Sequence, residues 1–152
     1  MRTLGVSGAG DVLYLAVAVD GQILDIAPYT FEEPVGIEEA KRLAALHNEA
    51  AKLVGALGVE RVRLLDAESS YSASYAALKK RIAVETVLML GCSDAGAEAG
   101  RVSRAKLRSL LGLPRGGTLL SLVPSITPPV GPKWARKRDL AALTAIAAYR
   151  EQ

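Results

Sequence analysis

The first 26 residues carry the pattern that most restricts how this chain can fold. Runs rich in apolar and β-branched residues occupy positions 2–7, 12–19 and 22–26, and only short polar connections separate them. The second connection is Asp20-Gly21, and an Asp-Gly pair between apolar runs favours a type I′ turn because both of its residues must adopt positive φ. The sequence therefore predicts a three-stranded antiparallel meander in this region.

After a loop through Pro28 and Pro34, the spacing of the apolar residues becomes that of a helix. Apolar residues recur three or four positions apart from 37 to 57, which predicts an amphipathic helix with one buried face. A short apolar run at 59–65 follows and predicts a strand that returns parallel to the sheet. The remaining elements are expected as helices at 72–93 and 103–111, a last strand at 118–123 and a terminal amphipathic helix at 133–150.

Length and composition limit the class of protein. The 152 residues predict a single domain, residues 1–152, with enough chain to bury a core. No apolar stretch reaches the roughly 18 residues that span a bilayer, and the start of the sequence lacks the pattern of a signal peptide. We therefore expect a soluble, cytoplasmic protein with no membrane partner. The one cysteine, Cys92, cannot form an internal disulfide, and we expect it to be buried.

The charges are unevenly distributed along the chain. Residues 99–138 contain no Asp or Glu and many Lys and Arg residues, although the net charge of the whole chain is only +3. A basic segment without carboxylates suits the binding of phosphate groups, because nearby carboxylates would repel them. We therefore predict a nucleic-acid-binding face, the alternative being an ordinary solvated surface. The candidate nucleic-acid-binding residues are Arg104, Lys106, Arg108, Lys133, Trp134, Arg136, Lys137, Arg138 and Tyr71.

The two aromatic residues in this set have alternative roles. Tyr71 follows the predicted parallel strand and is a candidate for stacking on a base, with core packing as the alternative. Trp134 stands among cations, a pattern typical of contacts to a nucleic-acid backbone. It could equally clamp the preceding loop onto the terminal helix.

Short motifs along the chain carry a resemblance to a known family. The order of the predicted elements resembles the RNase H-like α/β fold, a mixed five-stranded sheet of three antiparallel strands followed by parallel strands, flanked by helices. The likeness is greatest to the RuvC branch of Holliday-junction resolvases. Residues 5–9, Gly-Val-Ser-Gly-Ala, resemble the Gly-Ile-Asp-Pro-Gly segment of that branch. Asp66 and Glu68 match its strand-end acid, and residues 139–143 are similar to the Asp-Ala-Leu-Ala pattern of its last helix.

The resemblance implies a metal-dependent site that is incomplete in this chain. The family cuts phosphodiesters with two divalent ions held by about four carboxylates. By this likeness Asp66, Glu68 and Asp139 are the catalytic candidates. Ser7 stands where the family has an aspartate, and a hydroxyl is a weak ligand for a hard cation. Arg136 stands about one turn before Asp139, where the family has a further acid, and its charge opposes metal binding.

The sequence therefore predicts a RuvC-like nucleic-acid-binding protein with degenerate catalysis. One alternative is a divalent-metal-dependent nuclease acting on DNA or RNA, in which Asp66, Asp139 and Ser7 would hold Mg or Mn. A further alternative is a protein-interaction scaffold whose alanine-rich helices form a homodimer, as resolvases do.

Two further acidic residues, Glu85 and Asp11, lie outside the motifs of the resemblance. Glu85 lies inside the apolar second helix, where a buried carboxylate requires a partner, and Lys80 or Arg81 one turn away could supply it. Asp11 follows the first glycine turn. We interpret it as a turn residue, although it could also replace the acid missing at Ser7.

Overall fold

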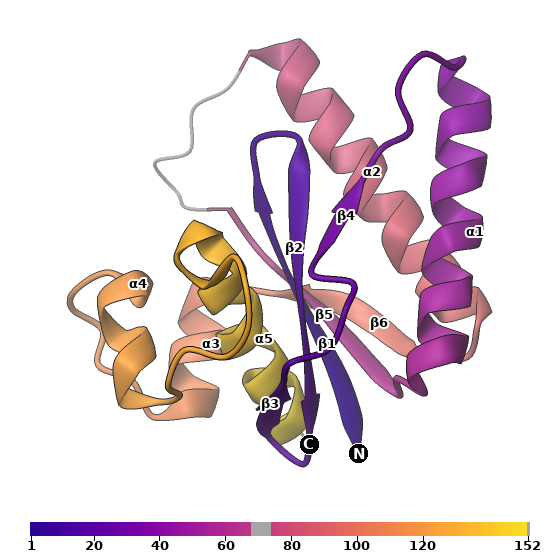
Figure 1. The fold of residues 1–152 in the computed structure, drawn as a ribbon. Coiled ribbons are helices and arrows are strands. Elements are labelled where there is room, and N and C mark those ends of the chain that lie inside the picture. The colour runs from indigo at the N-terminus through magenta and orange to yellow at the C-terminus, as the bar shows by residue number, and fades with distance from the viewer. Residues whose placement is uncertain (68–73, 152) are drawn as a thin grey trace.

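The computed structural model describes residues 1–67 and 74–151 and shows a mixed sheet with helices on both of its faces (Figure 1). The six-stranded sheet has the order β3-β2-β1-β5-β6, and β4 pairs with β2 outside this path. The strands are β1 (Arg2–Ala9), β2 (Val12–Val19), β3 (Gln22–Leu24), β4 (Thr30–Glu32), β5 (Arg61–Leu65) and β6 (Glu98–Val102). The helices are α1 (Glu39–Leu57), α2 (Tyr75–Asp94), α3 (Arg104–Leu111), α4 (Leu119–Leu122) and α5 (Asp139–Arg150).

The predicted meander is present at the start of the chain. Strands β1 and β2 pair antiparallel along their whole length, and β2 then pairs antiparallel with β3. The connecting residues Asp20 and Gly21 have φ values of 49° and 81°, as a type I′ turn requires. Strand β5 returns parallel to β1, and β6 adds parallel to β5. The carboxyl ends of these three strands therefore meet at one edge of the sheet, called here the carboxyl edge.

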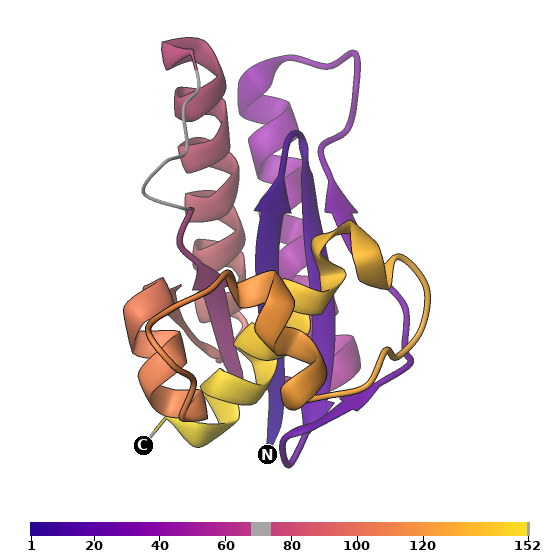
Figure 2. The ribbon, with the colours of Figure 1, turned by 90° about the vertical axis from the view of Figure 1, so that its left-hand side faces the viewer.

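Side chains of β1 alternate between the two faces of the sheet. Leu4 and Val6 join the core beneath α1 and α2, whereas the Thr3 hydroxyl donates to the Ala145 carbonyl of α5, 2.7 Å away. Figure 2 shows α5 together with α3 and α4 on one side of the sheet, and α1 with α2 on the other. None of the helices in the described ranges is long and apolar enough to cross a membrane.

The sheet has one strand more than predicted, and its last strand lies elsewhere. β4 forms within the stretch predicted as a loop, and β6 was not predicted. The predicted strand at 118–123 is wrong: this stretch forms α4, which runs into a 3-10 turn at Val123–Ser125. The Thr118 hydroxyl accepts a hydrogen bond from the Ser121 N–H and so caps α4.

The terminal helix begins later than predicted, at Asp139. The preceding segment Trp134–Arg138 is wound irregularly, with non-helical backbone at Arg136 and a φ of 74° at Lys137. A left-handed residue interrupts the helical hydrogen-bond pattern, so the basic residues of this segment lie outside the regular helix.

We predict that adding one methyl group at Gly5 disrupts the packing of α5 on β1. A Cβ at Gly5 would lie 1.9 Å from the Ala141 carbonyl oxygen and 2.4 Å from the Ala145 nitrogen, both backbone atoms. Gly5→Ala should therefore lower the free energy of unfolding by about 3 kcal/mol, measured by urea denaturation. The control is Gly55→Ala in α1, where the added methyl meets open space, and it should raise stability by about 0.5 to 1 kcal/mol. Equal stability of the two variants would contradict this close approach.

Candidate functional site

The carboxyl edge brings together residues that are distant in the sequence. Ser7 lies near the end of β1, and Asp66 directly follows β5. Because α5 runs back along β1, with Ala141 over Gly5 and Ala145 beside Thr3, its first turn lies on the same side of β1 as Ser7. The fold therefore places Asp139 toward this edge. Glu68 and Tyr71, both predicted site residues, lie outside the described residues.

Asp139 is buried at the start of α5. Its Oδ1 accepts a hydrogen bond from the N–H of Leu140, 2.8 Å away. Burial raises the pKa of the Asp139 carboxyl, and nearby backbone hydrogen bonds oppose this effect. A carboxylate kept in an unfavourable environment is a common feature of functional sites, which favours Asp139 as a candidate.

The described residues do not fit the two-ion centre that the resemblance implies. Within ranges 1–67 and 74–151, no group of three or more His, Cys, Asp or Glu side chains could hold a metal ion. Ser7 is a buried hydroxyl, and Arg136 is exposed at the position matched to a family acid. Of the predicted carboxylates, Asp66 and Asp139 lie within the described residues and Glu68 does not. Metal binding by Asp66, Asp139 and Ser7 therefore stays a prediction.

Guanidinium groups lie beneath the carboxyl edge, on the side of the sheet covered by α2. Glu85 of α2 is buried, and its two carboxylate oxygens accept from Arg81 Nε at 3.2 Å and Arg101 Nη1 at 2.9 Å. The Arg81 guanidinium also covers Gly8 of β1, where an added Cβ would lie 2.8 Å from Nη2. Of the two partners expected for Glu85, Lys80 and Arg81, the structure shows Arg81. Its second partner, Arg101, was missed because β6 was not predicted as a strand.

The backbone of Asp66 is fixed by its neighbours. Its N–H donates to the Val102 carbonyl at 3.0 Å, and its carbonyl accepts from Arg104 Nε at 3.0 Å. Arg104, a predicted nucleic-acid-binding residue, therefore ties the start of α3 to the end of β5.

The prediction that Arg138 contacts nucleic acid is wrong. Its side chain is 0% exposed. The guanidinium donates to the carbonyls of Leu15 at 3.0 Å, Leu24 at 3.5 Å, Pro132 at 3.3 Å and Val130. It also lies over the rings of Tyr29 and Trp134, 4.8 and 5.8 Å from their centroids. Burial lowers the pKa of this guanidinium. No phosphate could reach the group without displacing these contacts.

The other basic candidates differ in their surroundings. Arg108 donates to the carbonyls of Pro114, Gly116 and Gly117 and so fastens the turn after α3. Trp134 is half-buried and packs against the core of α5, which supports its role as a clamp between loop and helix. The exposed candidates are Lys106, Lys133, Arg136 and Lys137. The segment from α3 to α5 that carries them covers one side of the sheet (Figure 2).

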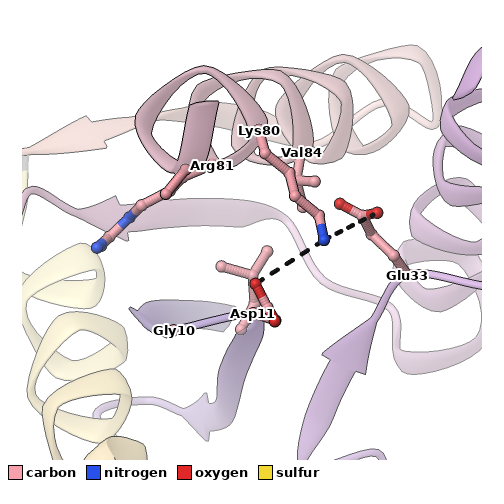
Figure 3. Close-up of a pocket in the computed structure, with 8 residues that line it drawn as sticks. Gly10, Asp11, Glu33, Lys80, Arg81 and Val84 are labelled. Atoms are coloured by element: carbon pink, nitrogen blue, oxygen red, sulfur yellow. Dashed lines mark ion pairs between the residues drawn. The ribbon is translucent and has the colours of Figure 1, made fainter. Parts of the chain in front are cut away.

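A small cavity of about 90 Å³ lies between the β1–β2 hairpin and α2 (Figure 3). Lys80 reaches from α2 between two carboxylates, with its Nζ 3.8 Å from Asp11 Oδ1 and 4.0 Å from Glu33 Oε2. Arg42 Nε lies 2.8 Å from the same Glu33 oxygen. Asp11 is exposed and lies in the turn between β1 and β2, as interpreted from the sequence, with Lys80 of α2 beside it.

Cys92 is buried as predicted. Burial raises the pKa of its thiol to about 11, so the thiol stays protonated near neutral pH and is a poor nucleophile.

The meander, the parallel strands β5 and β6 and the helices on both faces define an α/β fold of the RNase H-like class. Comparison with solved structures makes the likeness more specific. The chain is similar to RuvC of Thermus thermophilus, with a TM-score of 0.71 and 14% identity over 97% of this chain and 92% of that one. It is also similar to T. thermophilus RuvC in complex with a Holliday junction substrate, with a TM-score of 0.68 and 12% identity over 97% and 91% of the two chains.

These comparisons confirm the predicted RuvC-like fold. At such low identity the likeness concerns the fold alone. No protein-family model and no curated protein sequence matches the chain.

We predict that Asp139→Asn stabilises the protein, and that the gain depends on pH. The variant removes the charge but keeps an oxygen that can accept from Leu140 N–H. Because burial raises the pKa of Asp139 in the folded state above its ordinary value of 3.8, the ionised carboxylate costs stability. This cost is absent below the unfolded-state pKa, grows as the pH rises toward the folded-state pKa, and is constant above it. Each unit of difference corresponds to about 1.4 kcal/mol.

The measurement is the free energy of unfolding of both proteins in urea, from pH 3.5 to pH 8. The stability of the variant relative to the wild type should rise with pH and then level off. A difference that does not change with pH would show that Asp139 is not held in an unfavourable environment.

Proposed function

We propose that this chain is a nucleic-acid-binding protein on a RuvC-like fold, and that its metal-dependent catalysis is degenerate. The observation that carries the proposal is the acid-free segment 99–138, which presents Lys106, Lys133, Arg136 and Lys137 to solvent. Its part from α3 onward lies with α5 on one side of the sheet (Figure 2). One of the similar structures, T. thermophilus RuvC, is in complex with a Holliday junction substrate. The phosphate backbone supplies most of the affinity in such complexes, so exposed cations on one layer are the main requirement.

The degenerate catalysis rests on the residues of the carboxyl edge. Ser7 offers a neutral oxygen, and Arg136 adds a positive charge at the position matched to a family acid. Each of these features disfavours a pair of divalent cations. The alternative, a nuclease using Mg or Mn, requires that Asp66, Glu68 and Asp139 converge on at least one ion, with Ser7 as a further ligand.

We also propose that the protein forms a homodimer through α2. One face of α2 packs on α1 and the sheet, yet apolar side chains also occur on its opposite face. A helix that is apolar on two faces is expected to bury both of them. The exposed apolar residues of that second face are Tyr75, Leu78, Ile82 and Leu90.

We also propose that residues 1–152 form a single domain and that the protein is located in the cytoplasm.

We predict that exposed cations of segment 134–138 bind phosphates. The test compares Arg136→Gln/Lys137→Gln with Lys41→Gln/Lys52→Gln, a matched pair of exposed residues on α1. Binding to a labelled four-way junction, a duplex and a single strand is followed by fluorescence anisotropy in EDTA at several salt concentrations. The first variant should bind duplex DNA about tenfold more weakly, and the slope of log affinity against log salt should fall by about 1.8, or roughly 0.9 per lost contact. The α1 variant should behave like the wild type.

The same samples separate the proposal from its alternative. The wild type is also tested with an RNA strand of the same sequence. If it binds neither this RNA nor any of the DNA forms, the proposed nucleic-acid binding is contradicted. Cleavage that appears with manganese and disappears in Asp139→Asn would instead favour the nuclease.

We predict that Ile82→Glu, in the exposed face of α2, yields a monomer. A charge at the centre of an apolar interface must be desolvated without a partner, which prevents association. The control is Leu120→Glu, a similarly exposed apolar residue of α4 on the other side of the sheet. Light scattering after size-exclusion chromatography should give twice the chain mass for the wild type and the control. A monomeric wild type at high concentration would contradict the homodimer.

A further inference from the structure

We infer that a groove between β4 and α1 binds an extended peptide of a partner protein, which pairs with β4 as an added strand and places a Lys or Arg opposite Glu32. In Figure 1, β4 lies between β2 and α1. The groove is on the side of α1, whereas α3, α4 and α5 cover the other side of the sheet (Figure 2). The inference therefore does not depend on the proposed nucleic-acid binding.

The groove has the size and shape of a site for a short extended segment. Its volume is about 420 Å³, within the range of ordinary ligand sites. One wall is a stripe along one face of α1, formed by Leu46, Glu49, Leu53 and Ala56. Between the first and the last of these residues the helix rises about 15 Å, which is the length of four or five extended residues. Strand β4 forms the other wall.

The free edge of β4 offers backbone groups for pairing. In the described part of the chain β4 pairs with β2 alone. The N–H of Leu15 donates to the carbonyl of Tyr29, which directly precedes β4, at 2.9 Å. Pairs with and without hydrogen bonds alternate along an antiparallel ladder, so the N–H and C=O of Phe31 point toward β2. Those of Thr30 and Glu32 point toward the free edge, where an added strand can use them.

The side chains of the groove suit a strand with alternating apolar residues. Phe31 packs against the core on this side of the sheet, and Leu46 and Leu53 of that core are buried. Every second side chain of an added strand lies on the same face of the sheet as Phe31. These side chains of the peptide therefore meet apolar surface.

The charge at the rim favours a basic peptide. Glu32 is exposed and has no hydrogen bond or ion pair from its side chain within residues 1–67 and 74–151. The other lining charges, Glu49 and Lys52, lie 3.7 Å apart and offset each other. Arg42, near the end of β4, is 2.8 Å from Glu33. A Lys or Arg opposite Glu32 on the added strand would form a cross-strand pair.

A second copy of this chain is a poor occupant. A two-fold contact at this edge would bring together the Glu32 and Glu49 side chains of both copies, and like charges disfavour such a contact. Pro28 and Pro34 flank β4 and have no N–H to donate, so the edge pairs with a short segment instead of a long strand. The groove therefore fits a peptide from a different protein.

The first measurement selects peptides from a library of seven-residue sequences with the purified full chain as bait. The selected peptides should alternate apolar and polar residues and carry at least one Lys or Arg. One selected peptide is then synthesised with a fluorescent label and with a single N-methyl group at each position in turn. Affinity should fall about tenfold at every second position and change little at the positions between, because an added strand uses alternate N–H groups.

Variants of the chain locate the binding site. Ala56→Trp fills the groove and should weaken binding of the selected peptide at least tenfold, measured by fluorescence anisotropy. Ala44→Trp is the matched control, since Ala44 is also an exposed residue of α1 but does not line the groove. Glu32→Lys should weaken binding about tenfold by reversing the rim charge, and Glu38→Lys, at an exposed residue outside the groove, should not. Circular dichroism checks that each variant is folded.

Each outcome bears on one part of the inference. A library without enrichment, or Ala56→Trp binding as well as Ala44→Trp, overturns the groove as a peptide site. Loss of affinity at consecutive N-methyl positions overturns strand addition, and selection of acidic peptides overturns the role of Glu32. A change in chain mass by light scattering in Ala56→Trp would assign the groove to a second copy. Nucleic-acid binding should be the same in Ala56→Trp and the wild type, so its failure is recognised separately.

Discussion

The close contact between α5 and β1 determines how the rest of this structure is arranged. At Gly5 the two backbones lie so near each other that no side chain fits between them. The hydroxyl of Thr3 adds a hydrogen bond to the Ala145 carbonyl of α5. Because the helix is held along this line, its first turn reaches the carboxyl edge and Asp139 is buried there. Segment 134–138, which directly precedes α5, is brought to the same region as a consequence, although its backbone is irregular.

Local chemistry explains which parts of the fold could be predicted. The Asp20-Gly21 turn and the helical period of α1 are local signals, and both elements formed as expected. Strand β6 has no such signal, since Glu-Ala-Gly-Arg-Val lacks an apolar period. It forms because its backbone pairs with β5, with Gly100 opposite Arg63. The error at 118–123 has a local cause, because the Thr118 cap favours a helix over the extended form.

The candidate site was predictable only where it depends on single residues. Short motifs made Ser7 and Asp139 candidates, and their site roles stay predictions. The need of Glu85 for a partner followed from its apolar neighbours. The identity of Arg101 as a second partner depends on the pairing of a strand that the sequence does not mark. Arg138 illustrates the opposite error. Within a run of cations it has the pattern of a surface residue, yet four backbone carbonyls and two aromatic rings surround it.

The burial of Arg138 has a consequence for mutational scans of this protein. Its guanidinium holds the carbonyls of Val130 and Pro132, the residues that lead into the exposed Lys133 and Arg136. Truncating Arg138 would release that stretch of backbone and scatter the neighbouring charges, so ligand affinity would fall although the residue touches no ligand. A scan scored by affinity alone would count Arg138 among the contact residues. The distinction between an arginine that meets a phosphate and one that shapes the surface beside it requires folding stability to be measured on every variant.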